Sequence, residues 1–268
     1  MGSARLGRRQ FLELTGLAAA AAAGVAGCSG PPAQTPSTTA SSATTGSTAP
    51  PTAPATATTS PGPVALGRNA EGDLLNGPRT GTALALTFHG AGDPSLATRV
   101  FAELRAAGVS VTVFAVGSWL QANPSMASAV LDAGHDLGNH TYHHLPMSTL
   151  GAVAADDEVA RCAAVLTQLT GTAGHWFRPS GTATSNATIR AAARRSGYAE
   201  CVSYDVDSLD WTDPGSAAVT RNVLARSRPG SIVSMHLGHV GTVTALPAVL
   251  AGLHARGLRP VTLTELTS

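Results

Sequence analysis

Residues 83–88, Ala-Leu-Ala-Leu-Thr-Phe, form an apolar run of strand length, and a helix-like run at 95–107 follows and stops at Gly108. The same order of strand-like run, helix-like run and glycine recurs towards the end of the chain. This alternation is typical of βα-repeat folds with a parallel sheet. The sequence therefore predicts an α/β domain over residues 67–268, which is long enough to form one hydrophobic core.

The predicted elements of this domain share lengths that suit short strands and amphipathic helices. The seven strands are expected at 83–88, 110–116, 136–138, 175–178, 201–205, 231–236 and 260–263. The helices are expected at 95–107, 126–133, 156–169, 185–196, 217–227 and 243–256. Glycines follow five of the helical runs, where a helix stop favours them, at Gly108, Gly134, Gly171, Gly197 and Gly257.

A histidine-rich segment, Gly-Asn-His-Thr-Tyr-His-His at 138–144, follows the third predicted strand. On a helical turn His140 and His144 project from one face, so both rings reach a single ion of the Zn²⁺ class. The segment also fits a polar loop with exposed histidines, because pairs at this spacing are common.

Polar residues also follow the later strand-like runs. Arg178 begins Arg-Pro-Ser-Gly, Asp207 begins Asp-Ser-Leu-Asp-Trp, and His236 ends Ser-Ile-Val-Ser-Met-His. The carboxyl ends of parallel strands meet at one edge of a sheet or barrel, where α/β enzymes place their chemistry. We therefore expect these groups to share one site with the histidine pair.

The ordered set of motifs resembles the polysaccharide deacetylase family, also called the NodB-homology domain or carbohydrate esterase family four. The resemblance implies a distorted, incomplete (β/α) barrel of about seven parallel strands. It also implies metal-dependent hydrolysis of N- or O-acetyl groups on a cell-envelope polysaccharide. By this resemblance His140 and His144 bind one divalent metal ion, with Zn²⁺ the default, Arg178 orients the catalytic base, and His236 is the general acid.

The same resemblance assigns roles to the residues around His236. Asp207 would keep His236 charged, because a nearby carboxylate favours the imidazolium. Asp210 and Trp211 would shape the wall of the substrate pocket. Leu237 would help to line the slot for the acetyl group.

The first motif departs from the family. The family has Thr-Phe-Asp-Asp-Gly, whose two carboxylates are the base and a metal ligand, whereas this chain has Thr-Phe-His-Gly followed by Ala91, Gly92 and Asp93. We expect Asp93, swung inward by the glycine-rich turn, to ligate the metal, with His89 as base. The reversed roles, and a His89 without any catalytic role, stay open.

Two other classes of function remain open. One is a lipoprotein that keeps the fold to bind glycan or metal without hydrolysis, and the other is a scaffold whose linker and anchor matter more than its cleft. A metallopeptidase is disfavoured because the chain has no His-Glu-x-x-His motif. A net charge of +1 gives no footprint for nucleic acid.

The N-terminal residues predict export and anchoring. Arg8 and Arg9 precede an alanine-rich run at 17–26 that is too short to span a bilayer, which resembles a twin-arginine signal peptide over 1–27. Cys28 sits at the end of a lipobox-like sequence and would carry the lipid, the only membrane attachment expected. Residues 28–66, rich in Pro, Thr, Ser and Ala, would form a disordered linker.

The remaining expectations concern assembly and cysteines. The domain is expected to act as a monomer on its acetylated polysaccharide, at the outer face of the cytoplasmic membrane or in the cell wall. Two cysteines follow the lipobox, Cys162 in a predicted helix and Cys201 in a predicted strand. In an exported protein they either form a disulfide or remain separate buried thiols.

Overall fold

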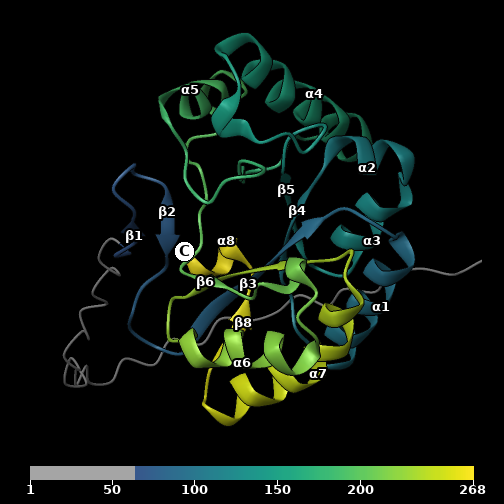
Figure 1. The fold of residues 1–268 in the computed structure, drawn as a ribbon, viewed down its shortest axis with the longest axis vertical. Coiled ribbons are helices and arrows are strands. Elements are labelled where there is room, and N and C mark those ends of the chain that lie inside the picture. The colour runs from purple at the N-terminus through teal and green to yellow at the C-terminus, as the bar shows by residue number, and fades with distance from the viewer. Residues whose placement is uncertain (1–63) are drawn as a thin grey trace, which may run out of the picture. The chain divides into compact units, whose positions relative to one another are not determined.

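The computed structural model describes residues 64–268, and its centre is a six-stranded sheet (Figure 1). The strands lie in the order β5-β4-β3-β7-β6, with β8 also paired to β3, and all their pairings are parallel. Their bounds are β3 Ala83–Gly90, β4 Thr112–Ala115, β5 Asp136–Asn139, β6 Val206–Asp207, β7 Ile232–His236 and β8 Arg259–Val261. Two short strands, β1 Gly67–Arg68 and β2 Leu74–Asn76, form a separate antiparallel pair.

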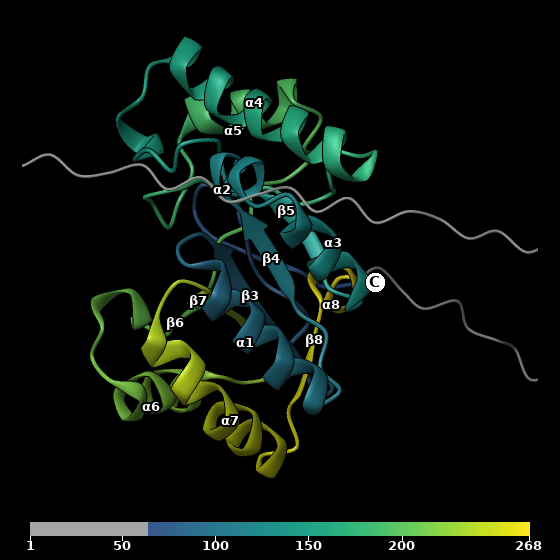
Figure 2. The ribbon, with the colours of Figure 1, turned by 90° about the vertical axis from the view of Figure 1, so that its right-hand side faces the viewer.

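The helices lie around this sheet. Figure 2 shows α4 and α5 towards one end of the view and α6 and α7 towards the other, with the strands between them. The six predicted helices are present within a few residues, as α1 Pro94–Ala106, α3 Ser125–Asp132, α4 Ala152–Thr170, α5 Ala187–Arg195, α6 Ser216–Arg226 and α7 Val240–Ala255. The prediction missed four short elements: α2 Gly117–Ala122, α8 Leu263–Leu266, and the 3₁₀ turns η1 Met147–Thr149 and η2 Asp210–Thr212.

The glycine stops are confirmed by their backbone angles. All five predicted positions have positive φ, between 65° and 89°. A side chain is disfavoured in this region, so glycine ends each helix at low cost.

Two predicted strands were wrong as full strands. The segment 201–205 makes only isolated bridges, at Cys201 and Val202, and strand β6 begins after it, at Val206. The segment 175–178 pairs only through Phe177, which bridges Asn139 on one side and Cys201 on the other. Pro179 has no amide hydrogen to extend the ladder, and the chain turns away there. The sheet therefore continues past β5 as isolated bridges, which gives the distorted, incomplete barrel that the sequence predicted.

The last predicted strand was wrong at its end. β8 stops at Val261, and α8 begins at Leu263 because the Thr262 hydroxyl accepts a hydrogen bond from the Glu265 amide, 3.1 Å away. A side-chain oxygen at this position caps a helix and satisfies one of its free N–H groups.

Strand β3 shows how the fold aims side chains at the barrel interior. Leu84, Leu86 and Phe88 belong to the large core under the helices, whereas Ala85 belongs to the smaller core with Phe114. Successive side chains of a strand point to opposite faces, so the next residues on the inner face are Thr87 and His89. The apolar pattern of β3 therefore carries His89 to the mouth of the barrel.

Residues 64–268 contain neither a disulfide nor a membrane-spanning helix. Cys162 and Cys201 are both buried free thiols, so no disulfide joins them. Within residues 64–268 no helix is long and apolar enough to cross a membrane. The predicted signal peptide, Cys28 and most of the predicted linker lie outside the described residues and stay predictions.

Candidate active site

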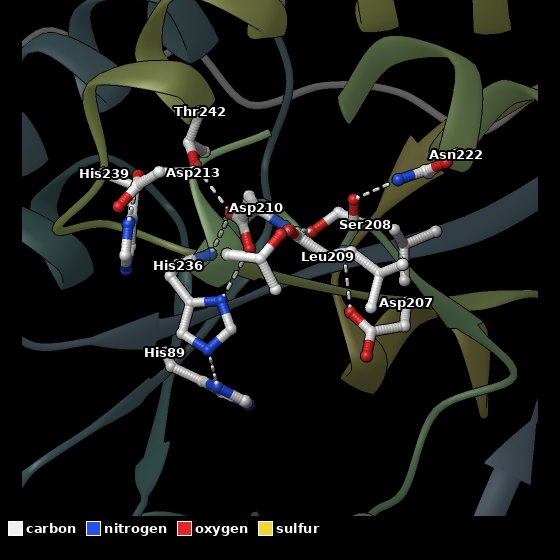
Figure 3. A network of polar contacts seen from close by, with 12 residues as sticks. His89, Asp207, Ser208, Leu209, Asp210, Asp213, Asn222, His236, His239 and Thr242 are labelled. Atoms are coloured by element: carbon white, nitrogen blue, oxygen red, sulfur yellow. Dashed lines mark hydrogen bonds and ion pairs between the residues drawn. The ribbon is translucent and has the colours of Figure 1, made fainter. Parts of the chain in front are cut away.

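A pocket of about 600 Å³ opens at the carboxyl ends of the strands. It contains several of the residues that the motifs indicated and several others, but Asp93, Arg178, Asp210 and Leu237 do not line it. Its lining comprises His89, Ala91, His140, His144, Pro179, Gly181, Thr182, Ala183, Tyr204, Asp207, Trp211, Ser234, His236 and His239. Figure 3 shows the polar network on one side of this pocket.

His89 and His236 meet because β3 and β7 are neighbours in register. The ladder pairs the two residues directly, and His89 Nδ1 lies 2.8 Å from His236 Nε2. The rings are edge to face, with centroids 4.4 Å apart. The position that the family gives to a carboxylate base is therefore filled by an imidazole bonded to the second histidine.

Arg178 is buried behind His89 and donates a hydrogen bond to its ring. It is 1% exposed, and its guanidinium donates four hydrogen bonds, to Thr87 Oγ1, His89 Nε2 and the carbonyls of Val202 and Ser203. Burial lowers the pKa of Arg178 to about 9, so it remains charged at pH 7. Among residues 64–268 no carboxylate lies within 4.0 Å of this cation.

These contacts determine which ring nitrogens carry protons. Arg178 can only donate, so His89 Nε2, 3.2 Å from Nη1, must accept, and the proton of neutral His89 sits on Nδ1. That proton is donated to His236 Nε2, which must then be unprotonated. Burial, and to a lesser degree the nearby histidines and Arg178, hold the pKa of His89 well below its ordinary value, so this ring is neutral.

The carboxylate that orients His236 is Asp210, which corrects the prediction of Asp207. Asp210 Oδ1 lies 2.7 Å from His236 Nδ1, and Oδ2 accepts from the His236 amide and the Thr242 hydroxyl. Burial alone would raise the pKa of Asp210, but the hydrogen bonds from His236 and Thr242 outweigh it and leave the pKa below its ordinary value. Asp207 lines the pocket, but its Oδ1 accepts from the Leu209 amide.

His140 and His144 lie in an irregular loop rather than on a helical turn. Thr141 and His144 have positive φ, 65° and 62°, a conformation that costs energy for these residues. The rings are nevertheless close, with centroids 4.9 Å apart. A loop, not helical periodicity, brings the two histidines together.

Glu158 of α4 holds this loop. Its carboxylate is buried and accepts hydrogen bonds from the amides of Tyr142 and His143 and from His143 Nδ1. On the other side, Thr141 bonds to the Ser180 hydroxyl of the Arg-Pro-Ser-Gly motif. The strained turn between the two pocket histidines is therefore fixed from both sides.

His140 has the features of a metal ligand. Its Nδ1 lies 2.8 Å from the Arg178 carbonyl and must donate to it, and its buried Nε2 has no hydrogen-bond partner in the described part of the chain. A histidine that binds a metal normally donates a hydrogen bond from the N–H of its other ring nitrogen, which leaves the first nitrogen with a lone pair for the ion. Burial, followed by the neighbouring His144, keeps the pKa of His140 well below its ordinary value, so the lone pair is free.

The third ligand predicted from the sequence does not join the pair. Asp93 is exposed at the N-cap of α1, where its Oδ1 accepts from the Ser95 amide at 2.8 Å. The sequence Asp-Pro-Ser favours this local cap over an inward swing. Across residues 64–268 no three His, Cys, Asp or Glu side chains are arranged to hold a metal, so the residues fit a divalent ion through two imidazoles only.

Of the residues predicted to line the pocket wall and the acetyl slot, Trp211 lines the pocket and Leu237 does not. Trp211 lines the pocket on η2 and is 55% exposed, so its ring is available to a ligand. Leu237 is fully buried in the main core and does not line the pocket, which corrects its assignment to an acetyl slot. Leu237 is the first residue after β7, in the turn that follows His236, and its side chain packs into the core.

Sequence reasoning gave no role to several pocket residues, among them Tyr204, Ser234 and His239. Tyr204 and Ser234 come from strand-like segments and carry no motif signal. His239 did carry one, because Asp210 and Asp213 are three residues apart and so are His236 and His239. Two such spacings within one site would have indicated a second histidine–aspartate pair.

Comparisons with known proteins identify the class of fold and site. A polysaccharide deacetylase family model matches residues 76–201. A peptidoglycan-N-acetylglucosamine deacetylase of Bacillus cereus is 30% identical over 199 residues, which cover 70% of this chain and 90% of that protein. The chain belongs to the polysaccharide deacetylase family, a family of hydrolases, and the resemblance drawn from its motifs is confirmed.

Solved structures of the same family include active and inactive proteins. A family 4 carbohydrate esterase from Streptomyces lividans in complex with acetate is 30% identical, with a TM-score of 0.61 over 67% of this chain and 91% of that one. A protein of Bacillus anthracis described as a family 4 pseudoenzyme is 25% identical, with a TM-score of 0.69 over 75% of this chain and 70% of that one. A mutant of that pseudoenzyme is described as having restored enzymatic activity.

The Glu158 contacts predict a measurable contribution to stability. Glu158→Ala leaves two backbone N–H groups without their partner, so we expect the free energy of unfolding to fall by about 1–3 kcal/mol. Asp157→Asn is the matched control, because this neighbouring carboxylate is exposed and pairs only with Arg161 at 3.4 Å. Equal stability of the two variants in urea unfolding would contradict the role given to Glu158.

Proposed function

We propose that the protein removes acetyl groups from a polysaccharide of the cell envelope, with the pocket between β3, β5, β6 and β7 as its active site. The related deacetylases named above support the reaction. The predicted lipobox and twin-arginine signal support the location of the substrate. The observation that carries the proposal is the His236–Asp210 pair, which shares this pocket with the unpartnered Nε2 of His140.

In this proposal His236 is the residue that moves protons. Entry of the acetyl group and a water between His89 and His236 opens their hydrogen bond and frees the lone pair of His236 Nε2. His236 then takes a proton from the water as its oxygen attacks the acetyl carbon, and Asp210 stabilises the imidazolium. The C–N or C–O bond breaks, the same proton passes from His236 to the leaving amine or alcohol, and acetate is released.

His89 acts as a donor rather than as the base expected from the sequence. Its Nε2 lone pair is occupied by Arg178, and its Nδ1 carries a proton. Once separated from His236, this N–H group is free to donate to the acetyl oxygen as negative charge develops on it. Arg178 holds the ring in that orientation. His236 therefore takes the role of base that the sequence analysis gave to His89, and it keeps the role of general acid.

We further infer that His140 and His144 hold a divalent ion, with Zn²⁺ preferred by imidazole ligands. The free lone pair of His140 and the position of His144 on the same pocket support this inference. When bound, such an ion polarises the acetyl carbonyl.

Loss of the proton carrier should remove activity. Asp210→Asn leaves His236 without its charged partner, so kcat for acetate release from peptidoglycan or N-acetylated chito-oligosaccharide should fall by about 10²- to 10⁴-fold. His236→Ala should be at least as severe. His254→Ala is the control, since His254 is exposed on α7 and is not in the pocket lining. Full activity of Asp210→Asn would show that this pair is not the catalytic unit.

A Zn²⁺-binding measurement tests whether His140, and not Asp93, is a metal ligand. In calorimetric titration with Zn²⁺ the wild-type protein should bind one ion, and His140→Ala should lose this binding because it removes the lone pair. Asp93→Asn should bind as the wild type does, and it keeps the helix cap because asparagine also caps. Loss of binding in Asp93→Asn would return Asp93 to the metal site.

A second candidate function is a glycan-binding protein without hydrolysis. It is favoured by His89 in the position of the base, by the lack of a carboxylate beside Arg178 among the described residues, and by the likeness to a pseudoenzyme.

His89→Asp tests this second function. The new carboxylate would pair with buried Arg178, so the free energy of unfolding should rise by roughly 1–3 kcal/mol, whereas neutral His89→Asn should give no such gain. Acetate release by His89→Asp but not by the wild type would select the binder. Acetate release by the wild type selects the hydrolase.

A further inference from the structure

A second histidine–aspartate pair lies at the mouth of the pocket. His239 Nδ1 is 2.8 Å from Asp213 Oδ1, and the His239 ring lies 5.7 Å from that of His236. Figure 3 shows His239 and Asp213 beside the inner pair formed by Asp210 and His236. The inner and outer pairs are thus adjacent members of one array.

The two pairs differ in what surrounds them. Asp210 is fully buried and its oxygens are occupied by His236 and Thr242, whereas Asp213 is 70% exposed. When the His239 ring is neutral and Nδ1 donates to the aspartate, Nε2 is an acceptor. Within residues 64–268 this Nε2 has no hydrogen-bond partner, although His239 lines the pocket. The outer pair, His239 and Asp213, therefore offers hydrogen-bond acceptors to a ligand in the pocket.

The turn that carries Asp213 is rigid and strained. Leu209 and Asp213 flank η2 with φ of 55° and 51°, in the left-handed region that side chains disfavour. The Asp207 carboxylate accepts from the Leu209 amide, and Asn222 donates to the Ser208 carbonyl. The fold thus maintains a costly turn that brings Trp211 to the pocket lining and Asp213 to the pocket residue His239.

We propose that His239 and Asp213 bind the hydroxyl groups of the sugar unit next to the one that is deacetylated. Sugar hydroxyls are donors that match the acceptors of both side chains, and the Asp213 carboxylate disfavours an anionic sugar at this position. The pair lies next to His236, and the pocket that His239 lines is also lined by the exposed ring of Trp211, against which a sugar can pack. The site is therefore expected to bind an uncharged oligosaccharide of at least two sugar units.

This inference rests on the proposed function, and the test compares substrates of two lengths. With N-acetylated chitotetraose, His239→Ala and Asp213→Asn should raise KM by about tenfold and leave kcat nearly unchanged, because they remove binding outside the reacting unit. With monomeric N-acetylglucosamine neither kcat nor KM should change. Neither variant should disturb the fold, because His239 makes no side-chain cap to α7 and asparagine tolerates the backbone of Asp213. His254→Ala is the control.

The outcomes separate this inference from the proposed function. If the variants slow monomer and tetramer alike, or change neither, the outer pair is not a subsite and the inference is overturned. If the wild type releases no acetate from any substrate, the proposed hydrolysis fails, and calorimetric binding of the tetramer becomes the measurement. Tetramer binding that is about tenfold weaker in both variants then supports the subsite, whereas unchanged binding, or no binding by the wild type, overturns it.

Discussion

The guanidinium of Arg178 connects the parts of the site. A buried cation without a carboxylate partner is costly, and here four hydrogen bonds compensate for the water it has lost. These bonds reach β3 through Thr87 and His89, and they reach the irregular segment beyond Cys201 through two carbonyls. The backbone of Arg178 also accepts from His140. One residue therefore ties together three stretches of chain that have little regular ladder between them.

The direction of these hydrogen bonds has chemical consequences. Because Arg178 can only donate, it fixes the proton of His89 on the side that faces His236, and His236 must then accept there and donate to Asp210. The Arg178 carbonyl likewise fixes the proton of His140 and leaves Nε2 free. With histidine at position 89, a hydrogen-bond donor faces His236 where an ionised carboxylate could only accept.

The sequence predicted those features that local physics determines. Helix stops such as Gly171 and Gly197 depend on φ at a single residue, and the inward direction of His89 depends on strand alternation. Both can be seen in a short stretch of sequence. The bridges at Phe177 could not be foreseen in this way, because pairing over one residue depends on neighbours that are distant along the chain.

In the site, too, local sequence was enough to predict some residues, whereas others depended on the conformation of the chain around them. The motifs identified His140, His144 and His236, which line one pocket, and Arg178, which is buried behind His89. The choice between Asp207 and Asp210 as partner of His236 depended on how η2 turns. Asp93 was misjudged because the competition between an inward swing and a helix cap was decided by its own neighbours, Pro94 and Ser95. Leu237 was misjudged because the strand ends at His236 and the next side chain packs into the core.

The pairing of β8 with β3 bears on how the protein matures. Besides β4, strand β3 pairs with two strands that are distant along the chain, Ile232–His236 and Arg259–Val261. Such contacts close late, because the long segment between Gly90 and Ile232 must be synthesised before they form. Until then β3 exposes an unpaired apolar edge. A translocation route that waits for completed tertiary structure, as the predicted twin-arginine signal implies, would keep that edge from being threaded unprotected through the membrane.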